Sequence, residues 1–195
     1  MTILDSSDII KSKGLLVLAE TYIEHYTVID YQHWEGNWEL VYGIPYAMAP
    51  SPMVTHQSIS GKIFVALSKA LQDCPNCQPL FEIDWEVGSD TVVRPDTLVI
   101  CYEPDEKLTK KPELIFEIAS PSTVRRDEVL KYELYQQEGV KYYVIVYPEM
   151  GVAKVYELHQ GRYIKVGDFS DEIYQFDVDG CEIGFNFSGI WRVKK

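Results

Sequence analysis

The stretch ELIFEIASPSTVRRDEVLKYELYQQEGVKYYVIVY, residues 113–147, does most to decide the fold. Residues 113–120 and 141–147 each predict a strand, and 141–147 is too short and too rich in β-branched and aromatic residues for a helix. Between them, Ser and Pro favour the start of a helix and Gly139 its end. A strand, a helix and a second strand in this order predict a right-handed crossover between parallel neighbours.

The flanking sequence predicts more strands and one further helix. The strands that precede residue 113 are joined by loops and can therefore be antiparallel. We expect an α/β fold with α+β character, in which helices flank a mixed β-sheet. The expected elements are a hairpin at 37–50 that turns near Tyr42 and Gly43, a helix at 54–71 with Thr55 as N-cap, strands at 79–87 and 91–100, and a hairpin at 153–166 with Gly161 in its turn.

No repeat, linker or low-complexity segment divides the 195 residues. We therefore expect one domain over 1–195, with a helical extension at 1–30 and a β-rich tail at 150–195. Residues 15–26 have the pattern of a short amphipathic helix within that extension. The N-terminus has acids where a signal peptide has bases, and the apolar runs are shorter than a membrane span. These features predict a cytoplasmic protein with no membrane partner.

The formal net charge is −12, which argues against a general nucleic-acid coat protein, because phosphate binding depends on Lys and Arg. The charge is unevenly distributed. Residues 94–131 contain seven basic and eight acidic residues, so nearly all of the excess negative charge lies elsewhere. A local basic surface near this segment is compatible with the sequence.

The chain has four cysteines, and two of them, Cys74 and Cys77, have CxxC spacing. A structural zinc site needs about four ligands, and neither a second CxxC nor an HxxxH is present. The pair follows a helical stretch and has Pro and Asn between its members, which favours a turn. We interpret the pair as two incidental thiols, with metal or redox chemistry as the less favoured alternative.

Two apolar strands each contain one acid, Asp96 in VVRPDTLVI (92–100) and Glu117 in ELIFEIAS (113–120). Burying an unpaired carboxylate is unfavourable, so such a residue is usually paired, protonated or bound to metal. If the two strands pair, both acids can point to the same end of the sheet. Two close carboxylates must then share a proton or a cation, and Mg²⁺ is a cation that binds one or two carboxylates and keeps several waters.

The following helix adds Asp127, Lys131 and Tyr135, which are four residues apart and so form one stripe. A Lys that faces a metal site can orient or help to deprotonate a water, or stabilise charge on a phosphate. Three simpler explanations stay open. Asp127 and Lys131 match an ordinary i, i+4 ion pair, and Glu117 matches an edge-strand or salt-bridged residue. A carboxylate pair also serves glycoside hydrolysis, although little else in the sequence indicates a sugar cleft.

These positions resemble one family. The order Pro95-Asp96, then Glu117-Ile118-Ala119-Ser120-Pro121-Ser122-Thr123, then Asp127, Lys131, Tyr135 and Gly139-Val140 is similar to the Uma-type restriction-endonuclease-like family of the PD-(D/E)XK nuclease superfamily. The resemblance includes WELVYG, APSPMVTHQSISGKIFVAL and GVKYYVIVYPE, and covers about residues 35–165. The Pro-Asp pair alone is a weak signal, whereas the Glu-x-x-Ser-Pro-Ser-Thr run with Asp and Lys at these spacings is a strong one.

The resemblance implies a restriction-endonuclease-like fold and a metal-dependent endonuclease that hydrolyses phosphodiester bonds in DNA with Mg²⁺ or Mn²⁺. Asp96 and Glu117 would be metal ligands together with the carbonyl of Ile118. The Lys that commonly stands two residues after the Glu is replaced by Ala119, so its role would fall to Lys131. The resemblance also implies supporting roles near the metal for Glu39, Asp84, Asp127, Tyr135 and His56, although His56 fits a capping or packing role equally well.

The sequence departs from the family pattern at Tyr42, Tyr143 and Tyr147, which puts any role of those outer positions in doubt. A homodimer is compatible with two cuts on a duplex. The alternative is a catalytically silent module that binds nucleic acid or protein and retains the nuclease fold.

Overall fold

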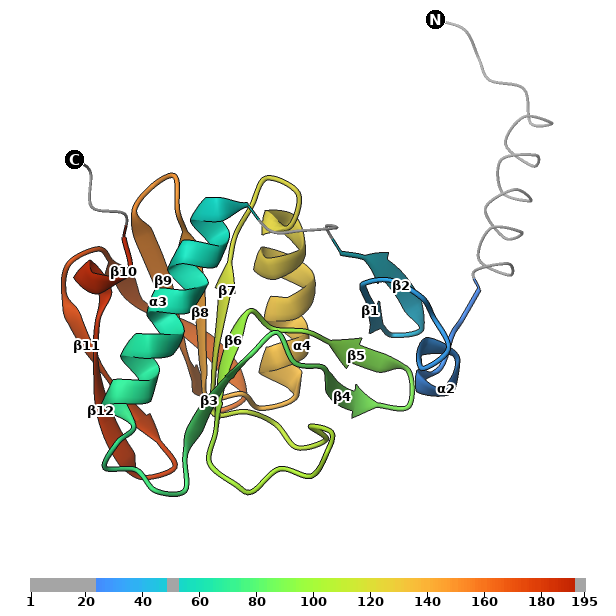
Figure 1. Cartoon of the computed structure of the whole chain (residues 1–195), viewed down its shortest axis with the longest axis horizontal. Coiled ribbons are helices and arrows are strands. Elements are labelled where there is room, and N and C mark those ends of the chain that lie inside the picture. Colours follow the sequence, from blue (N-terminus) through green and yellow to red (C-terminus); the bar gives the residue numbers. More distant parts are fainter. Residues whose placement is uncertain (1–23, 49–52, 192–195) are drawn as a thin grey trace, which may run out of the picture.

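A computed structural model describes residues 24–48 and 53–191 (Figure 1). A six-stranded sheet in the order β10-β9-β8-β7-β6-β3 forms its centre, next to a four-stranded sheet in the order β2-β1-β5-β4 and a two-stranded sheet, β11-β12. The strands of the central sheet are β3 (Gln78–Phe81), β6 (Thr97–Ile100), β7 (Leu114–Ile118), β8 (Tyr142–Tyr147), β9 (Val152–His159) and β10 (Arg162–Phe169). The other strands are β1 (Trp38–Val41), β2 (Ile44–Ala47), β4 (Trp85–Gly88), β5 (Thr91–Val93), β11 (Ile173–Val178) and β12 (Cys181–Asn186).

The strand–helix–strand unit predicted at 113–147 is confirmed as a parallel crossover. β7 pairs with β8 in parallel, and the helical segment between them consists of η1 (Arg126–Lys131) and α4 (Tyr132–Gln137). Gly139 follows the helix with φ +76°, a left-handed conformation that glycine adopts without strain. β6 and β3 continue the sheet on the other side of β7 as antiparallel strands, so the sheet is mixed, as expected.

The segment η1 is a π-helix rather than a regular α-helix. Its hydrogen bonds run from residue i to i+5, so residues five apart lie on the same face. The i, i+4 spacing of the sequence did not indicate this change. Figure 1 shows the helical segment on one face of the central sheet and the long helix α3 (Val54–Ala70) on the other.

Two apolar cores follow from the alternation of side chains along the central strands. On one face, Leu114, Phe116 and Ile118 of β7 pack with α3 and with the β11-β12 hairpin. On the other face, Ile115 of β7 packs with α4 and the second sheet. Glu117 has the same parity as Ile115, so its side chain enters the core on the α4 face.

Several predicted elements are confirmed, and several boundaries are corrected. The 37–50 hairpin forms as β1 and β2, and its turn residues Tyr42 and Gly43 have φ +52° and +74°. The helix at 54–71 forms as α3, but its N-cap is Met53, because the helix begins at Val54 and Thr55 already lies in its first turn. The predicted helix at 15–26 and most of the 1–30 extension lie outside the described residues, and the described end of that extension contains the short helix α2 (Val28–Tyr31).

Two predicted strands are each divided in the structure. The 79–87 segment becomes β3 and β4, because Glu82 adopts a left-handed φ of +48° between them. The 91–100 segment becomes β5 and β6, because Pro95 cannot donate a ladder hydrogen bond. The chain leaves the second sheet for the central sheet at this point, which places Asp96 where the two sheets meet.

The interpretation of Cys74 and Cys77 as incidental thiols is wrong. Cys74 is joined to Cys181, and Cys77 is joined to Cys101. The partners are distant in the sequence, and the pairing depends on the fold bringing the end of α3, β6 and β12 together, which the spacing of the cysteines did not reveal. None of the helices that the structure describes is long and apolar enough to cross a membrane.

Candidate active site

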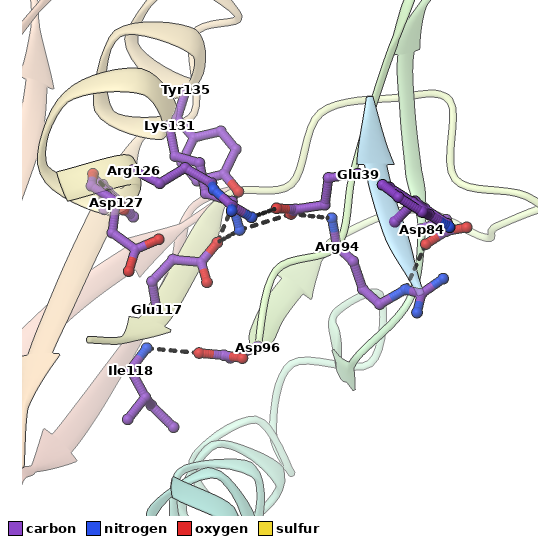
Figure 2. Close-up of polar contacts among 12 residues, drawn as sticks. Glu39, Asp84, Arg94, Asp96, Glu117, Ile118, Arg126, Asp127, Lys131 and Tyr135 are labelled. Carbon is purple, nitrogen blue, oxygen red and sulfur yellow. Dashed lines mark hydrogen bonds and ion pairs between the residues drawn. The ribbon is translucent and has the colours of Figure 1, made fainter. Parts of the chain in front are cut away.

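Asp96 and Glu117 lie at the same end of adjacent strands, as the sequence predicted. β6 and β7 are antiparallel with Thr97 opposite Phe116, and the next step of this register sets Asp96 opposite Glu117. The amide of Ile118 donates a hydrogen bond of 2.7 Å to Asp96 Oδ2 (Figure 2). His56 from the first turn of α3 reaches the same oxygen, with Nε2 3.1 Å away. Asp96 is therefore fixed by β7 on one side and α3 on the other.

Glu117 is held by the helix that follows its strand. Lys131 Nζ donates a hydrogen bond of 2.9 Å to Glu117 Oε1, and the hydroxyl of Tyr135 donates one of 2.8 Å to the same oxygen. Lys131 and Tyr135 thus share one face of the helix, as their spacing predicted. Lys131 forms ion pairs with Glu117 and Glu39 rather than the ordinary i, i+4 pair with Asp127.

Glu39 joins the site from β1 in the second sheet. Its carboxylate accepts hydrogen bonds from Lys131 Nζ at 2.8 Å, Arg126 at 3.1 Å and the backbone amide of Arg94 at 2.9 Å. The π-helical turn explains why two bases reach one acid, because Arg126 and Lys131 are five residues apart and so lie on the same face. Figure 2 shows Lys131 between Glu39 and Glu117, at the junction of the two sheets.

Buried negative charge exceeds buried positive charge at this junction. Among the described residues, the buried ionisable side chains are Glu39, Glu117, Asp127 and Lys131, each at most 4% exposed. Three acids therefore surround one ammonium group, and Arg126 adds a second, partly exposed cation. A buried carboxylate without full compensation takes up a proton or binds a cation.

The pKa directions follow this imbalance. Burial raises the pKa of Glu117 well above its usual value, although the charge of Lys131 opposes the rise. Burial likewise raises the pKa of Asp127, to about 6. For Glu39, burial would raise the pKa, but the charge and hydrogen bond of Lys131 lower it. Burial would lower the pKa of Lys131, but the charges of Glu117 and Glu39 raise it, so the amine is protonated at neutral pH.

His56 has one engaged and one free ring nitrogen. Burial would lower its pKa, but the hydrogen bond with Asp96 and the charge of Asp96 raise the pKa above the usual value. Its Nδ1 is buried and has no hydrogen-bond partner among the described residues. His56 therefore contacts Asp96 directly, which goes beyond a capping role.

Asp84 does not join this group. Its carboxylate accepts a hydrogen bond of 2.6 Å from Arg94 Nε and one of 2.9 Å from the hydroxyl of Tyr31. Figure 2 shows this pair on the far side of β1 from Glu117 and Asp96. The structure therefore brings together every predicted site residue except Asp84.

The residues fit a divalent cation that is bound mainly by Asp96 and Glu117. Each carboxylate has one oxygen engaged, while Asp96 Oδ1 and Glu117 Oε2 accept no hydrogen bond from any residue that the structure describes. Within the same residues, no three His, Cys, Asp or Glu side chains are already arranged around one ion position. Two carboxylates and a carbonyl suffice for Mg²⁺, which keeps several of its waters. The raised pKa of Glu117 also fits, because a bound cation would offset the desolvation of its charge.

The site opens into a cleft of about 650 Å³, which is the size of typical small-ligand sites. One wall is the loop from Ser120 to Thr123, in which the hydroxyl of Thr123 accepts a hydrogen bond from the amide of Ser120. The lining also includes hydroxyl, basic and acidic side chains, among them Thr55, His56, Arg94, Asp96, Glu117, Ser120, Ser122, Arg126, Asp127, Lys131 and Glu149.

Sequence reasoning missed Arg126 and Arg94. The side chain of Arg126 binds Glu39 and lies over the ring of Tyr46, 5.0 Å from its centroid. Arg94 presents its amide to Glu39 and its guanidinium to Asp84. Neither role could be read from spacing, because each depends on the contact between the two sheets and, for Arg126, on the π-helical turn.

The three tyrosines that depart from the family pattern lie outside the carboxylate group. Tyr143 donates a hydrogen bond to the backbone carbonyl of Asp127 at 3.0 Å, and so supports the helix behind the site. Tyr147 donates one to Glu128, and Tyr42 donates one to Gln137.

A mixed sheet with a helix on each face and buried acids at the end of β7 defines the restriction-endonuclease-like class of nuclease folds. A crystal structure from Anabaena variabilis ATCC 29413, described as "a putative nuclease belonging to DUF820", is similar with a TM-score of 0.70. The match covers 85% of this chain and 97% of that one at 14% sequence identity, so it shows a shared fold. The family model "Uma2: Putative restriction endonuclease" matches residues 23–177, and the chain belongs to this family. Comparison with curated proteins gives no match.

Proposed function

We propose that the chain is a metal-dependent endonuclease that hydrolyses phosphodiester bonds in DNA. The observation that carries this proposal is the buried charge imbalance at the end of β7, where three buried acids surround one buried ammonium group. The unpaired oxygens of Asp96 and Glu117 face the same cleft, and a divalent cation would satisfy both. Membership of a restriction-endonuclease-like family supports the same assignment.

In this proposal Asp96, Glu117 and the carbonyl of Ile118 hold Mg²⁺ or Mn²⁺. When bound, such a cation acts as a Lewis acid towards a phosphate oxygen and increases the acidity of water. The hydrogen bonds from Ile118 and His56 fix the orientation of Asp96. Those from Lys131 and Tyr135 leave the other oxygen of Glu117 directed towards the ion.

The state of Lys131 selects between its two proposed roles. Because its pKa is raised by Glu117 and Glu39, Lys131 is a protonated ammonium group and not a general base. A fixed positive charge of this kind stabilises the negative charge that develops on a phosphate during hydrolysis. Arg126 and the hydroxyls of Ser120 and Ser122 line the same cleft and would contact phosphate oxygens.

The second candidate is a binding module that retains the nuclease fold without turnover. The observation that favours it is the position of Lys131, which is already held by two carboxylates. The net charge of −12 also opposes the approach of a polyanion. A divalent cation in the site would weaken both objections, so metal binding is the property that separates the two candidates.

The test combines metal binding with cleavage in the same samples. Mg²⁺ and Mn²⁺ are titrated by calorimetry into wild type, Asp96→Asn and Glu117→Gln, and supercoiled plasmid, single-stranded DNA and RNA are then added. We expect wild type to bind metal and cut DNA, and both variants to lose both properties. Metal binding without cleavage of any substrate would favour the binding module, and absence of binding at millimolar metal would refute the nuclease. Cleavage of RNA alone would correct the substrate.

A further inference from the structure

All four cysteines of the chain converge at one place, away from the nuclease site. They come from the turn after α3 (Cys74 and Cys77), the residue after β6 (Cys101) and the first residue of β12 (Cys181). The two linked pairs are separated by 107 and 24 residues in the sequence. The four cysteines therefore meet through the fold, not through local spacing.

The two pairs are close neighbours. Cys74 and Cys77 share a tight turn in which the amide of Cys77 donates a hydrogen bond of 2.9 Å to the carbonyl of Cys74. The sulfurs of Cys77 and Cys101 each lie 3.9 Å from the carbonyl oxygen of Val178. Val178 is the direct partner of Cys181 in the β11-β12 ladder. One carbonyl at the end of the hairpin thus links both pairs.

We propose that, in the reduced chain, these four cysteines bind one Zn²⁺ as a structural tetrathiolate site. Four thiolates at tetrahedral positions are a common structural zinc site, with sulfurs about 3.8 Å apart for a Zn–S distance of about 2.3 Å. The CxxC turn supplies two ligands at the usual spacing. Cys101 and Cys181 supply the two ligands that the sequence did not reveal.

The surroundings suit a structural ion. Cys74 is 4% exposed and belongs to the core under α3, and the other three cysteines are half-buried against it. The end of α3, the β3-β6 edge and the β11-β12 hairpin all meet here, so one ion would join three segments. Figure 1 shows these segments on the side of the molecule opposite the β1-β2 hairpin.

The disulfide and zinc forms differ by a defined reaction. Opening both disulfides takes up four electrons and four protons, which a dithiol or a phosphine supplies. Each thiol then releases its proton as its sulfur binds Zn²⁺. In the disulfide form the sulfurs are not free to act as ligands, so oxidation and zinc binding exclude each other.

The full chain is reduced anaerobically with a phosphine, desalted and checked for four free thiols, and Co²⁺ is then titrated as a spectroscopic probe. We expect one Co²⁺ per chain with strong thiolate-to-cobalt charge-transfer absorption, which stoichiometric Zn²⁺ displaces. The variants Cys101→Ser and Cys181→Ser should each weaken this binding at least tenfold. The double variant Asp96→Asn, Glu117→Gln should keep it unchanged, which separates this site from the nuclease site.

Four free thiols without charge-transfer absorption would overturn the proposal. So would an absorption that Cys101→Ser and Cys181→Ser leave unchanged, because the ion would then be held by Cys74 and Cys77 alone. If a serine variant does not fold, the stoichiometry and spectrum of the wild-type cobalt complex decide the matter. Hydrogen exchange provides a second readout, since zinc should slow exchange in β12 of the reduced wild type.

Discussion

Lys131 and Glu117 form a buried ion pair across the α4 face of the central sheet, with 2.9 Å between Nζ and Oε1 and with each side chain at most 5% exposed. The same ammonium group lies 2.8 Å from Glu39 in the second sheet. Lys131 thus joins the strand that carries the catalytic Glu to a sheet that lies outside the crossover unit. This geometry gives Lys131 a structural role in addition to its proposed catalytic role.

We therefore expect Lys131→Met to reduce both stability and cleavage. Removing one partner of a buried pair leaves uncompensated charge and costs about 3–5 kcal/mol of unfolding free energy. Loss of a fixed charge at the reacting phosphate should lower the cleavage rate by about 10²–10³-fold. Urea unfolding without metal and plasmid cleavage with Mg²⁺ measure the two effects.

Lys154→Met is the matched control. Lys154 pairs with Glu128 at 3.2 Å, but the two side chains are 27% and 40% exposed, so this change should cost less than about 1 kcal/mol. Equal stability losses in the two variants would contradict the assignment of buried charge to the Lys131 site.

Asp96→Asn should remove metal binding with little effect on the metal-free fold. The Asn carboxamide oxygen can still accept the hydrogen bond from Ile118, and the substitution removes one negative charge from the site. With Mg²⁺ at about one hundred times its Kd, wild type should gain about 2.7 kcal/mol of stability, and Asp96→Asn should gain none. Thermal unfolding with and without Mg²⁺ measures this difference.

Asp84→Asn serves as the comparison for that experiment. Asp84 binds Arg94 and Tyr31 rather than the cleft carboxylates, so this variant should keep the full Mg²⁺-dependent gain. A lost gain in Asp84→Asn would mean that the metal lies nearer the second sheet than the carboxylate geometry indicates.

The sequence predicted the central part of this site because the information there is local. Glu117 sits in an unbroken apolar strand, and the four-residue spacing of Lys131 and Tyr135 survives in the helix, so the Glu117 contacts followed from pattern alone. Asp84 failed for a physical reason. The predicted strand at 79–87 breaks at Glu82, and the break redirects Asp84 towards Arg94.

The parts that could not be predicted depend on contacts between distant segments. The π-helical turn brings Arg126 to Glu39, and no residue in 126–131 marks such a turn in advance. The partners of Cys74 and Cys77 are single cysteines with no motif of their own. Long-range pairing of this kind is fixed by the sheet order, which periodicity does not specify.

Arg126→Gln should weaken the junction between the two sheets. Its guanidinium binds Glu39 at 3.1 Å, lies over Tyr46 and is 20% exposed. We expect a loss of about 1–2 kcal/mol, because Lys131 still compensates Glu39. Arg125→Gln, at the exposed neighbouring position, should change stability by less than about 0.5 kcal/mol. Matching denaturation midpoints for the two variants would show that the Arg126–Glu39 pair adds nothing to the junction.

The metal-free protein should lose stability as the pH rises from about 4 to about 7. Burial raises the pKa of Asp127 to about 6 from its ordinary value of 3.8, so the folded state binds a proton more tightly than the unfolded state over this range. Stability falls with rising pH wherever the folded state binds more protons, and Asp127 accounts for as much as about 3 kcal/mol of the fall. The raised pKa of His56 acts in the same direction, since its stabilising charge is lost as the pH rises above its folded value.

Urea unfolding between pH 4.5 and 7.5 in the presence of a chelator measures this dependence, and Asp127→Asn isolates the part due to Asp127. The Asn side chain keeps the shape of Asp127 but does not titrate, so the slope of stability against pH should become clearly shallower. Mg²⁺ should also flatten the wild-type profile, because a bound cation compensates the charges that otherwise require protons. A wild-type profile that rises with pH over this range, or one that Asp127→Asn leaves unchanged, would show that the Asp127 carboxylate is compensated by Lys131 and needs no further cation.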